Sequence, residues 1–208
     1  MAVKDLNKQH IEHHIHVWAA IREYVVEILP TGLPAVLRTD MPAGTWEYVG
    51  FEPTKAEFDA AAAIALEDKQ RFLTEALMTL DLAGIPPESS KTASFVKEIE
   101  TAQTGMATRC RLKVTSSKEE GSKLAASGQV GIHEEMAVFD KIKTEEDFRR
   151  QGLGTLIMQT LGAEAHARGA TTGWLIGTPD GQKLYNQLGW EQNYWVLVLG
   201  NKNIIKNP

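Results

Sequence analysis

Cysteine and long apolar runs are scarce in this chain of 208 residues, and each scarcity excludes a class of protein. Cys110 is the single cysteine, so an intrachain disulfide and a site built from several thiolates are both excluded. A reducing, cytoplasmic setting fits this composition best. No segment approaches the run of roughly 18 apolar residues that spans a bilayer, and the first ten residues lack the apolar stretch of a secretory signal. We therefore expect a cytoplasmic protein with no membrane partner.

An excess of basic charge is also lacking. The chain carries 22 lysines and arginines against 27 aspartates and glutamates, which gives a formal net charge of -5. Nucleic acid is disfavoured as a partner because binding it generally requires a basic face, although a local basic cluster would escape this average. What the chain does have is a hydrophobic fraction of 43%, which suits a globular protein with a substantial core.

The first half contains both helical and extended patterns. Apolar residues recur at helical spacing over residues 6–29, which predicts an amphipathic helix that ends before Pro30. Residues 33–51 are typical of two short strands around a turn. Residues 53–80 are rich in strong helix formers and predict one or two helices, and a short helix is expected over residues 95–99.

The second half alternates between strands and helices. Three strands are predicted first, over residues 107–115, 123–132 and 135–144. The apolar residues of the helix that follows fall on one face, and Gly169 is placed to end it. A second helix is expected to be capped by Thr178 and to end at Gly189. The apolar run 194–200 is predicted as a core strand that can also form a dimer edge, so a homodimer is possible.

The segment "RRQGLG" joins a predicted strand to a predicted helix, and two familiar phosphate motifs fail there. A Rossmann fingerprint requires a third glycine where Ile157 stands. A P-loop requires lysine and then serine or threonine after its last glycine, whereas Thr155 and Leu156 follow Gly154. A tight turn that holds no ligand is the simplest alternative.

The flanks of this segment favour a pyrophosphate site over a plain turn. The helix is expected to begin at or just after Gly152, and its first N–H groups have no partner within the helix. The helix dipole adds partial positive charge at the same place. Glycines let a phosphate approach the backbone closely, and Arg149 and Arg150 add two cations.

With these residues the sequence resembles the GNAT superfamily of N-acetyltransferases. "RRQGLG" matches the Arg/Gln-x-x-Gly-x-Gly/Ala signature with which that family holds the pyrophosphate of acetyl-CoA. "EMAVFDKIKT" and "KLYNQLGW" lie where the family has its acyl-binding strand and its Leu-Tyr-x-x-Leu-Gly-Phe segment. The resemblance covers about residues 107–199, and none is recognised in residues 1–105.

The resemblance implies a single α/β N-acetyltransferase domain over residues 1–208. Its fold would be a GNAT-type mixed, mainly antiparallel central sheet with a splayed strand pair, helices on both faces and an N-terminal helical extension. The strand ending at Thr144 would separate from its neighbour, and the pantetheine arm of acetyl-CoA would lie along its free edge. A backbone N–H there is the expected donor to the thioester oxygen, on which negative charge grows as the amine attacks.

The implied cofactor site includes backbone and side-chain groups from three segments. The residues expected there are Ile142, Lys143, Thr144, Arg149, Arg150, Gln151, Gly152, Leu153, Gly154, Thr155 and Thr178. Thr178 replaces an asparagine that the family often has at this position, which leaves its contact with the cofactor open. No metal is expected.

Transfer from a thioester to an amine requires a neutral amine, a stabilised oxyanion and a proton for the departing thiolate. Tyr185 occupies the position at which many family members place a tyrosine near the sulfur as general acid. The alternative is that Tyr185 is an ordinary core residue of an amphipathic helix.

The general base is less well defined. Asp140 is predicted to lie on the same side of its strand as Ile142 and Thr144, because side chains alternate along a strand. Its carboxylate is therefore a candidate base, and Glu134 and Glu135 are rivals. These acids can also simply solvate a strand end, and an amine that arrives neutral needs no base.

Four histidines lie close together in "HIEHHIHVW", and His10 and His14 are one helical turn apart, as zinc ligands can be. The His-Glu-x-x-His pattern of a metalloprotease is not present, because Glu12 does not directly follow a histidine. The histidines are therefore interpreted as part of the polar face of a terminal helix.

The predicted function is transfer of an acetyl group from acetyl-CoA to a primary amine by direct attack on the thioester. The acceptor would be a small-molecule amine or a lysine or N-terminal amine, and the sequence does not identify it. The alternatives are an acyl-CoA-binding regulatory or interaction protein without turnover, and a plain nucleotide-binding domain.

Overall fold

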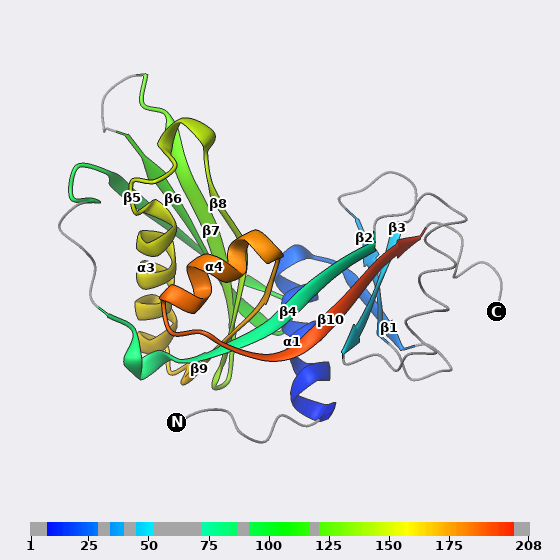
Figure 1. The fold of residues 1–208 in the computed structure, drawn as a ribbon. Helices are drawn as coiled ribbons and strands as arrows, with labels where there is room; N and C mark the ends of the chain where they lie inside the picture. The colour runs from blue at the N-terminus through cyan, green and yellow to red at the C-terminus, as the bar shows by residue number, and fades with distance from the viewer. Residues whose placement is uncertain are drawn as a thin grey trace.

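The computed structural model describes residues 8–28, 34–39, 45–51, 72–86, 92–116 and 121–201. Figure 1 shows the elements, which are α1 Lys8–Arg22, β1 Val25–Ile28, β2 Pro34–Arg38, β3 Thr45–Phe51, β4 Phe72–Asp81, η1 Leu82–Gly84, β5 Val96–Thr104, β6 Ala107–Thr115, β7 Leu124–His133, β8 Met136–Thr144, η3 Glu146–Phe148, α3 Leu153–Ala167, β9 Thr172–Gly177, α4 Pro179–Gln187 and β10 Glu191–Asn201.

The described strands form one sheet of ten strands in the order β1-β2-β3-β10-β4-β9-β8-β7-β6-β5. All neighbouring pairs are antiparallel except β8 with β9, so the sheet is mixed and mainly antiparallel, as predicted. The strand β10 pairs with β3 on one side and with β4 on the other. The prediction that this strand is available as a dimer edge is therefore wrong, because both of its edges are used.

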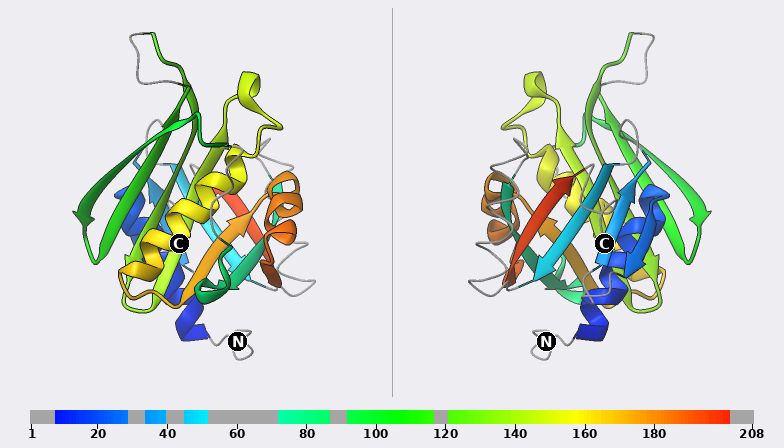
Figure 2. Two further views of the ribbon diagram at one scale, coloured as in Figure 1. Left: turned by 90° about the vertical axis from the view of Figure 1, so that its left-hand side faces the viewer. Right: turned by 90° about the vertical axis from the view of Figure 1, so that its right-hand side faces the viewer.

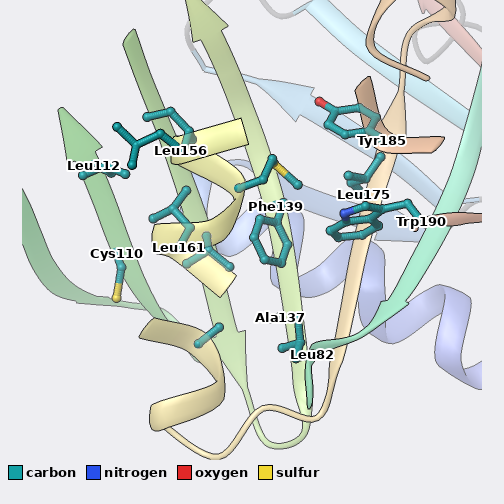
Figure 3. Packing of buried hydrophobic residues seen from close by; sticks show 14 of the residues in the cluster. Leu82, Cys110, Leu112, Ala137, Phe139, Leu156, Leu161, Leu175, Tyr185 and Trp190 are labelled. Atoms are coloured by element: carbon teal, nitrogen blue, oxygen red, sulfur yellow. The ribbon is translucent and has the colours of Figure 1, made fainter. Parts of the chain in front are cut away.

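Helices cover both faces of the sheet (Figure 2). The helices α3 and α4 pack on one face, in a hydrophobic cluster that includes Phe139 and Leu161 (Figure 3). The helix α1 packs on the opposite face, in a cluster that includes Ile21 and Val138. Gly131 lets α1 approach β7, because a Cβ there would lie 2.3 Å from a methyl carbon of Ile21. Val138 and Phe139 are neighbours in β8 yet belong to opposite clusters, as alternation along a strand requires.

Parts of three predicted helices are strands instead. Residues 72–81 form β4, which lies between β10 and β9 and buries Ala76, Leu77 and Met78. Helix propensity is weak compared with burial on both faces of a sheet, so tertiary pairing decides the conformation here. Residues 53–71 of the same prediction lie outside the described residues.

The other two corrections concern shorter segments. Residues 96–104 form β5, which pairs along its whole length with β6, so the predicted helix over residues 95–99 is wrong. The first helix ends at Arg22 and not near residue 29, because Glu23 adopts a left-handed conformation with φ of 59° and β1 follows. The predicted strands over residues 33–51 are confirmed as β2 and β3, whereas their turn lies outside the described residues.

The elements predicted for the second half are confirmed within three residues, including the helix ends at Gly169 and Gly189, whose φ angles are 97° and 84°. Within the described residues, no helix combines the length and the apolar character that crossing a membrane requires.

Candidate functional site

The parallel strands β8 and β9 separate after a short paired stretch. Their register covers three pairs, which end at Val138 opposite Trp174. Beyond this point β8 continues to Thr144 and β9 to Gly177 with no further pairing between them. This is the splayed strand pair that the resemblance implied, and it leaves backbone groups on the facing edges without a partner strand.

A β-bulge in β8 accounts for the separation. Asp140 pairs with Gln129 of β7, and Lys143 pairs with Ser127, so two residues of β8 oppose the single residue Gly128. Lys141, within the bulge, has a positive φ of 52°. A bulge bends its strand and increases the local twist, which turns the end of β8 away from β9.

The bulge also changes which face the side chains occupy. Ile142 packs on the face of α3, where a Cβ built on Gly128 would lie 2.8 Å from Ile142 Cδ1. Asp140 lies on the face of α1, where it binds Arg22. The prediction that Asp140 shares a side with Ile142 and Thr144 is therefore wrong, because strict alternation ends at the bulge.

Asp140 is held in a buried ion pair. Arg22 Nε donates a hydrogen bond to Asp140 Oδ2 at 2.8 Å, Arg22 Nη2 donates to Oδ1, and Gln129 Nε2 donates to Oδ2 at 2.7 Å. Burial by itself would raise the pKa of the Asp140 carboxyl, but the hydrogen bonds and charge of Arg22, with the hydrogen bond of Gln129, hold this pKa below its usual 3.8. A carboxylate with so low a pKa is a weak acceptor of a proton. Arg22 was missed because it is 118 residues away in the sequence and carries no local signal.

Tyr185 lies on α4 at the end of β9. Thr178 begins this helix, as predicted, because its hydroxyl oxygen accepts a hydrogen bond from Gly181 N at 3.3 Å. The Tyr185 ring packs against Gly177 and Gly181, where a Cβ would lie 3.2 Å and 2.9 Å from ring carbons. Figure 3 shows the Tyr185 hydroxyl directed away from Trp190.

The phenol of Tyr185 remains protonated over the physiological range. Burial, together with the negative charges of Asp140 and Glu75, raises the pKa of Tyr185 to about 12. Glu75 belongs to β4, and its neighbour Ala76 pairs with Gly177 at the end of β9. The charges of Asp140 and Glu75 therefore both act on the phenol of Tyr185. Glu75 was missed because its segment was predicted as a helix.

The predicted pyrophosphate loop leads directly into α3. Gly152 is the N-cap of this helix and adopts the left-handed conformation, with φ of 79°, and no side chain caps the helix. Arg149, Arg150 and Gln151 are exposed next to it. The backbone N–H groups of the first turn are therefore oriented as an anion site requires.

The start of α3 is in contact with α4. A Cβ on Gly154 would lie 2.8 Å from Leu184 Cδ2 of α4 and 3.9 Å from Thr144 Oγ1 at the end of β8. The Leu153 side chain is buried and that of Thr155 is half-buried, so at Leu153 only the backbone is open to a ligand. The loop, the end of β8 and the helix that carries Tyr185 are therefore brought together.

Three other residues lie less favourably for the roles predicted for them, which were cofactor binding for Lys143 and general base for Glu134 and Glu135. Lys143 is exposed and forms an ion pair with Glu145 at 2.8 Å. Glu134 and Glu135 form the turn between β7 and β8, at the opposite end of β8 from Thr144. Glu134 and Glu135, the alternative candidates to Asp140 as general base, therefore do not lie at the point where β8 and β9 separate.

Comparison with known proteins finds similarity at the level of solved structures alone. No protein-family model and no curated protein matches the chain. A GCN5-related N-acetyltransferase-like protein from Streptococcus suis 89/1591 matches with a TM-score of 0.51 and 11% identity, over 92% of this chain and 99% of that one.

Two further structures match over part of their length. A GCN5-related N-acetyltransferase from Sphaerobacter thermophilus matches with a TM-score of 0.50 and 10% identity, over 74% of this chain and 59% of that one. One from Kribbella flavida has a TM-score of 0.45 and 19% identity, over 67% of this chain and 63% of that one. The chain spans less than two thirds of both proteins. This chain has the fold of the GCN5-related N-acetyltransferases. The GNAT fold predicted from the sequence is therefore confirmed.

Proposed function

We propose that this protein transfers the acetyl group of acetyl-CoA to a primary amine. The observation that carries the proposal is the separation of β8 from β9 beside the start of α3, with Tyr185 at the end of β9. We further propose a single domain over residues 1–208, of which about residues 107–199 bind acetyl-CoA.

The cofactor would lie along β8 and the start of α3. We assign its pyrophosphate to the N–H groups of Gly152, Leu153, Gly154 and Thr155, with Arg149, Arg150 and Gln151 around it. The pantetheine arm would pair with the free edge of β8 at Ile142, Lys143 and Thr144. The oxygen of Thr178 already caps α4, so its hydroxyl hydrogen is the group left for the cofactor.

The chemistry follows from the groups near the end of β9. The amine nitrogen attacks the thioester carbon, and the oxyanion that forms is stabilised by an N–H group of β8. The carbon–sulfur bond then breaks, and the thiolate takes the phenol proton of Tyr185. The amine must also lose a proton before or during attack.

Two carboxylates are candidates for the general base that takes the proton of the amine. Asp140 stays a prediction as base, but its ion pair with Arg22 disfavours this role because its pKa is low. Glu75, whose negative charge contributes to the raised pKa of Tyr185, is the second candidate. The ion pair of Asp140 with Arg22 is the observation that favours the alternative function, a protein that binds an acyl-CoA without turnover.

The test combines turnover with binding. Acetyl-CoA consumption is measured over amines, amino acids, aminoglycosides, polyamines and lysine peptides, and calorimetry measures acetyl-CoA affinity. We expect Tyr185→Phe to lower kcat by about 10²–10⁴ with nearly unchanged affinity, because it removes only the donated proton.

We expect Glu75→Gln to remove the acidic limb of the pH–rate profile. Binding without turnover on any acceptor would favour the alternative, and absence of acetyl-CoA binding would contradict both.

A further inference from the structure

The prediction that the histidines of α1 lie on a polar helix face is wrong for His14, which is buried. The ring nitrogens His13 Nε2 and His133 Nδ1 lie 3.1 Å apart, although the residues are 120 positions apart in the sequence. Glu134 follows His133 in the turn between β7 and β8. One ligand atom from each of these three side chains lies within 4.8 Å of the other two. Three groups that commonly bind metal ions therefore converge from two distant segments.

We propose that His13, His133 and Glu134 bind a Zn²⁺ ion, with water as the fourth ligand. Imidazole nitrogen and carboxylate oxygen are both ligands of this ion, and two histidines with one glutamate form a known three-residue ligand set. The sequence-based expectation of no metal is replaced by this proposal.

The spacing of the ligand atoms suits a tetrahedral ion. With Zn–N bonds of about 2.0–2.1 Å, two nitrogens on a tetrahedral ion lie about 3.3 Å apart. The observed 3.1 Å between His13 Nε2 and His133 Nδ1 is within a few tenths of an ångström of this value. The ion would lie between the two rings and the Glu134 carboxylate.

A metal ion and a shared hydrogen bond are the two explanations for the close approach of the His13 and His133 rings. Neutral imidazole is the form that binds a metal ion, because a protonated nitrogen has no lone pair to donate. In the absence of an ion, the same two rings can share one hydrogen bond, and this is the competing interpretation.

The position of the cluster makes it accessible and separate from the acetyl-CoA site. His13 and His133 are half-buried and Glu134 is exposed, so an ion can enter from solvent. The cluster lies at the end of β8 opposite Thr144. The ion would connect α1 to the β7–β8 turn, and α1 is also the helix that carries Arg22 to Asp140. A stabilising role for the ion is therefore expected.

The test uses the untagged full chain, treated with EDTA, dialysed and titrated with ZnCl₂ by calorimetry. We expect one bound ion, and a Tm about 5 °C higher in excess ZnCl₂ than in EDTA. His133→Ala should weaken binding by at least about 100-fold and remove the Tm shift. The matched control is His16→Ala, which changes an exposed histidine of the same helix and should retain both effects.

Circular dichroism in EDTA establishes that each variant is folded, and Glu134→Gln provides a milder change that leaves both rings in place. Unchanged Tm of the wild type in ZnCl₂, or equal Zn²⁺ affinity in the wild type and His133→Ala, would overturn the proposal. The pair would then be a hydrogen bond between two imidazoles. The measurement involves no acetyl transfer, so its failure is separate from any failure of the proposed function.

Discussion

Arg22 and Asp140 form a charged pair that is largely removed from water, with side-chain exposures of 16% and 8%. A buried ion pair adds little net stability compared with well-packed apolar residues, because both charges lose hydration. Removing one partner is costly, however, since the other charge stays buried without compensation. The pair therefore makes Asp140 an anchor for α1 more than a proton acceptor.

We expect Arg22→Met to lower the free energy of unfolding by about 3–5 kcal/mol at pH 7, because it leaves the Asp140 carboxylate buried without its cation. Methionine keeps much of the packing of the arginine stem. Adding Asp140→Asn should recover most of the loss, since the amide carries no charge. Urea unfolding of the two single variants and the double variant measures the coupling.

The loss in Arg22→Met should depend on pH. In the wild type the folded pKa of Asp140 lies below its unfolded value of 3.8, so its stabilising contribution is present above pH 3.8 and is lost as the pH falls through the folded pKa. Without Arg22, burial dominates and the folded pKa rises. The difference between variant and wild type should then be small near pH 3 and should grow toward neutral pH. A difference that is the same at all pH values would contradict this account.

At the scale of elements, the contact between α3 and α4 connects the proposed pyrophosphate loop to the helix of Tyr185. It depends on Gly154, where a Cβ would lie 2.8 Å from Leu184 Cδ2. We expect Gly154→Ala to destabilise the protein by about 1–3 kcal/mol through overpacking, reduced by up to about 1 kcal/mol because alanine favours helix. Acetyl-CoA affinity should fall as well, because the N–H groups of the first turn would move.

Urea unfolding and calorimetry with acetyl-CoA measure these two effects. Gly84→Ala is the matched control, since a Cβ at Gly84 has no neighbour within 4 Å among the described residues. Combining Gly154→Ala with Leu184→Ala should restore much of the lost affinity by removing the close contact. If Gly154→Ala binds acetyl-CoA as tightly as the control, the packing of these helices does not position the loop.

The elements that the sequence predicts well are those with strong local patterns. The helix α3 has one apolar face and a glycine at each end, and the helix α4 has a capping threonine. The strand β4 was predicted wrongly because its alanine, leucine, methionine and glutamate favour helix, whereas its position between β9 and β10 depends on distant partners. The bulge at Lys141 had no local signal either, and it decided the orientation of Asp140.

At the scale of the whole molecule, the two halves of the sequence contribute to the same sheet. The strands β3 and β4 come from the first half, and β10 of the second half lies between them. The helix α1 also packs across β6, β7 and β8. Such interleaving favours the single domain that we propose, because neither half buries its apolar surface alone.

We therefore expect one cooperative unfolding transition. Trp18 reports on the face of α1 and Trp190 on the face of α3 and α4, and both are buried, so tryptophan fluorescence follows both clusters. Its midpoint in urea should coincide with that of far-ultraviolet circular dichroism. If the proposed site and the single domain are right, excess coenzyme A should move both midpoints upward together, because it would bind only the folded state. Trp190→Phe leaves the buried residues Trp18 and Trp174 on the face of α1, and a midpoint of this variant that does not respond to coenzyme A would contradict a single domain.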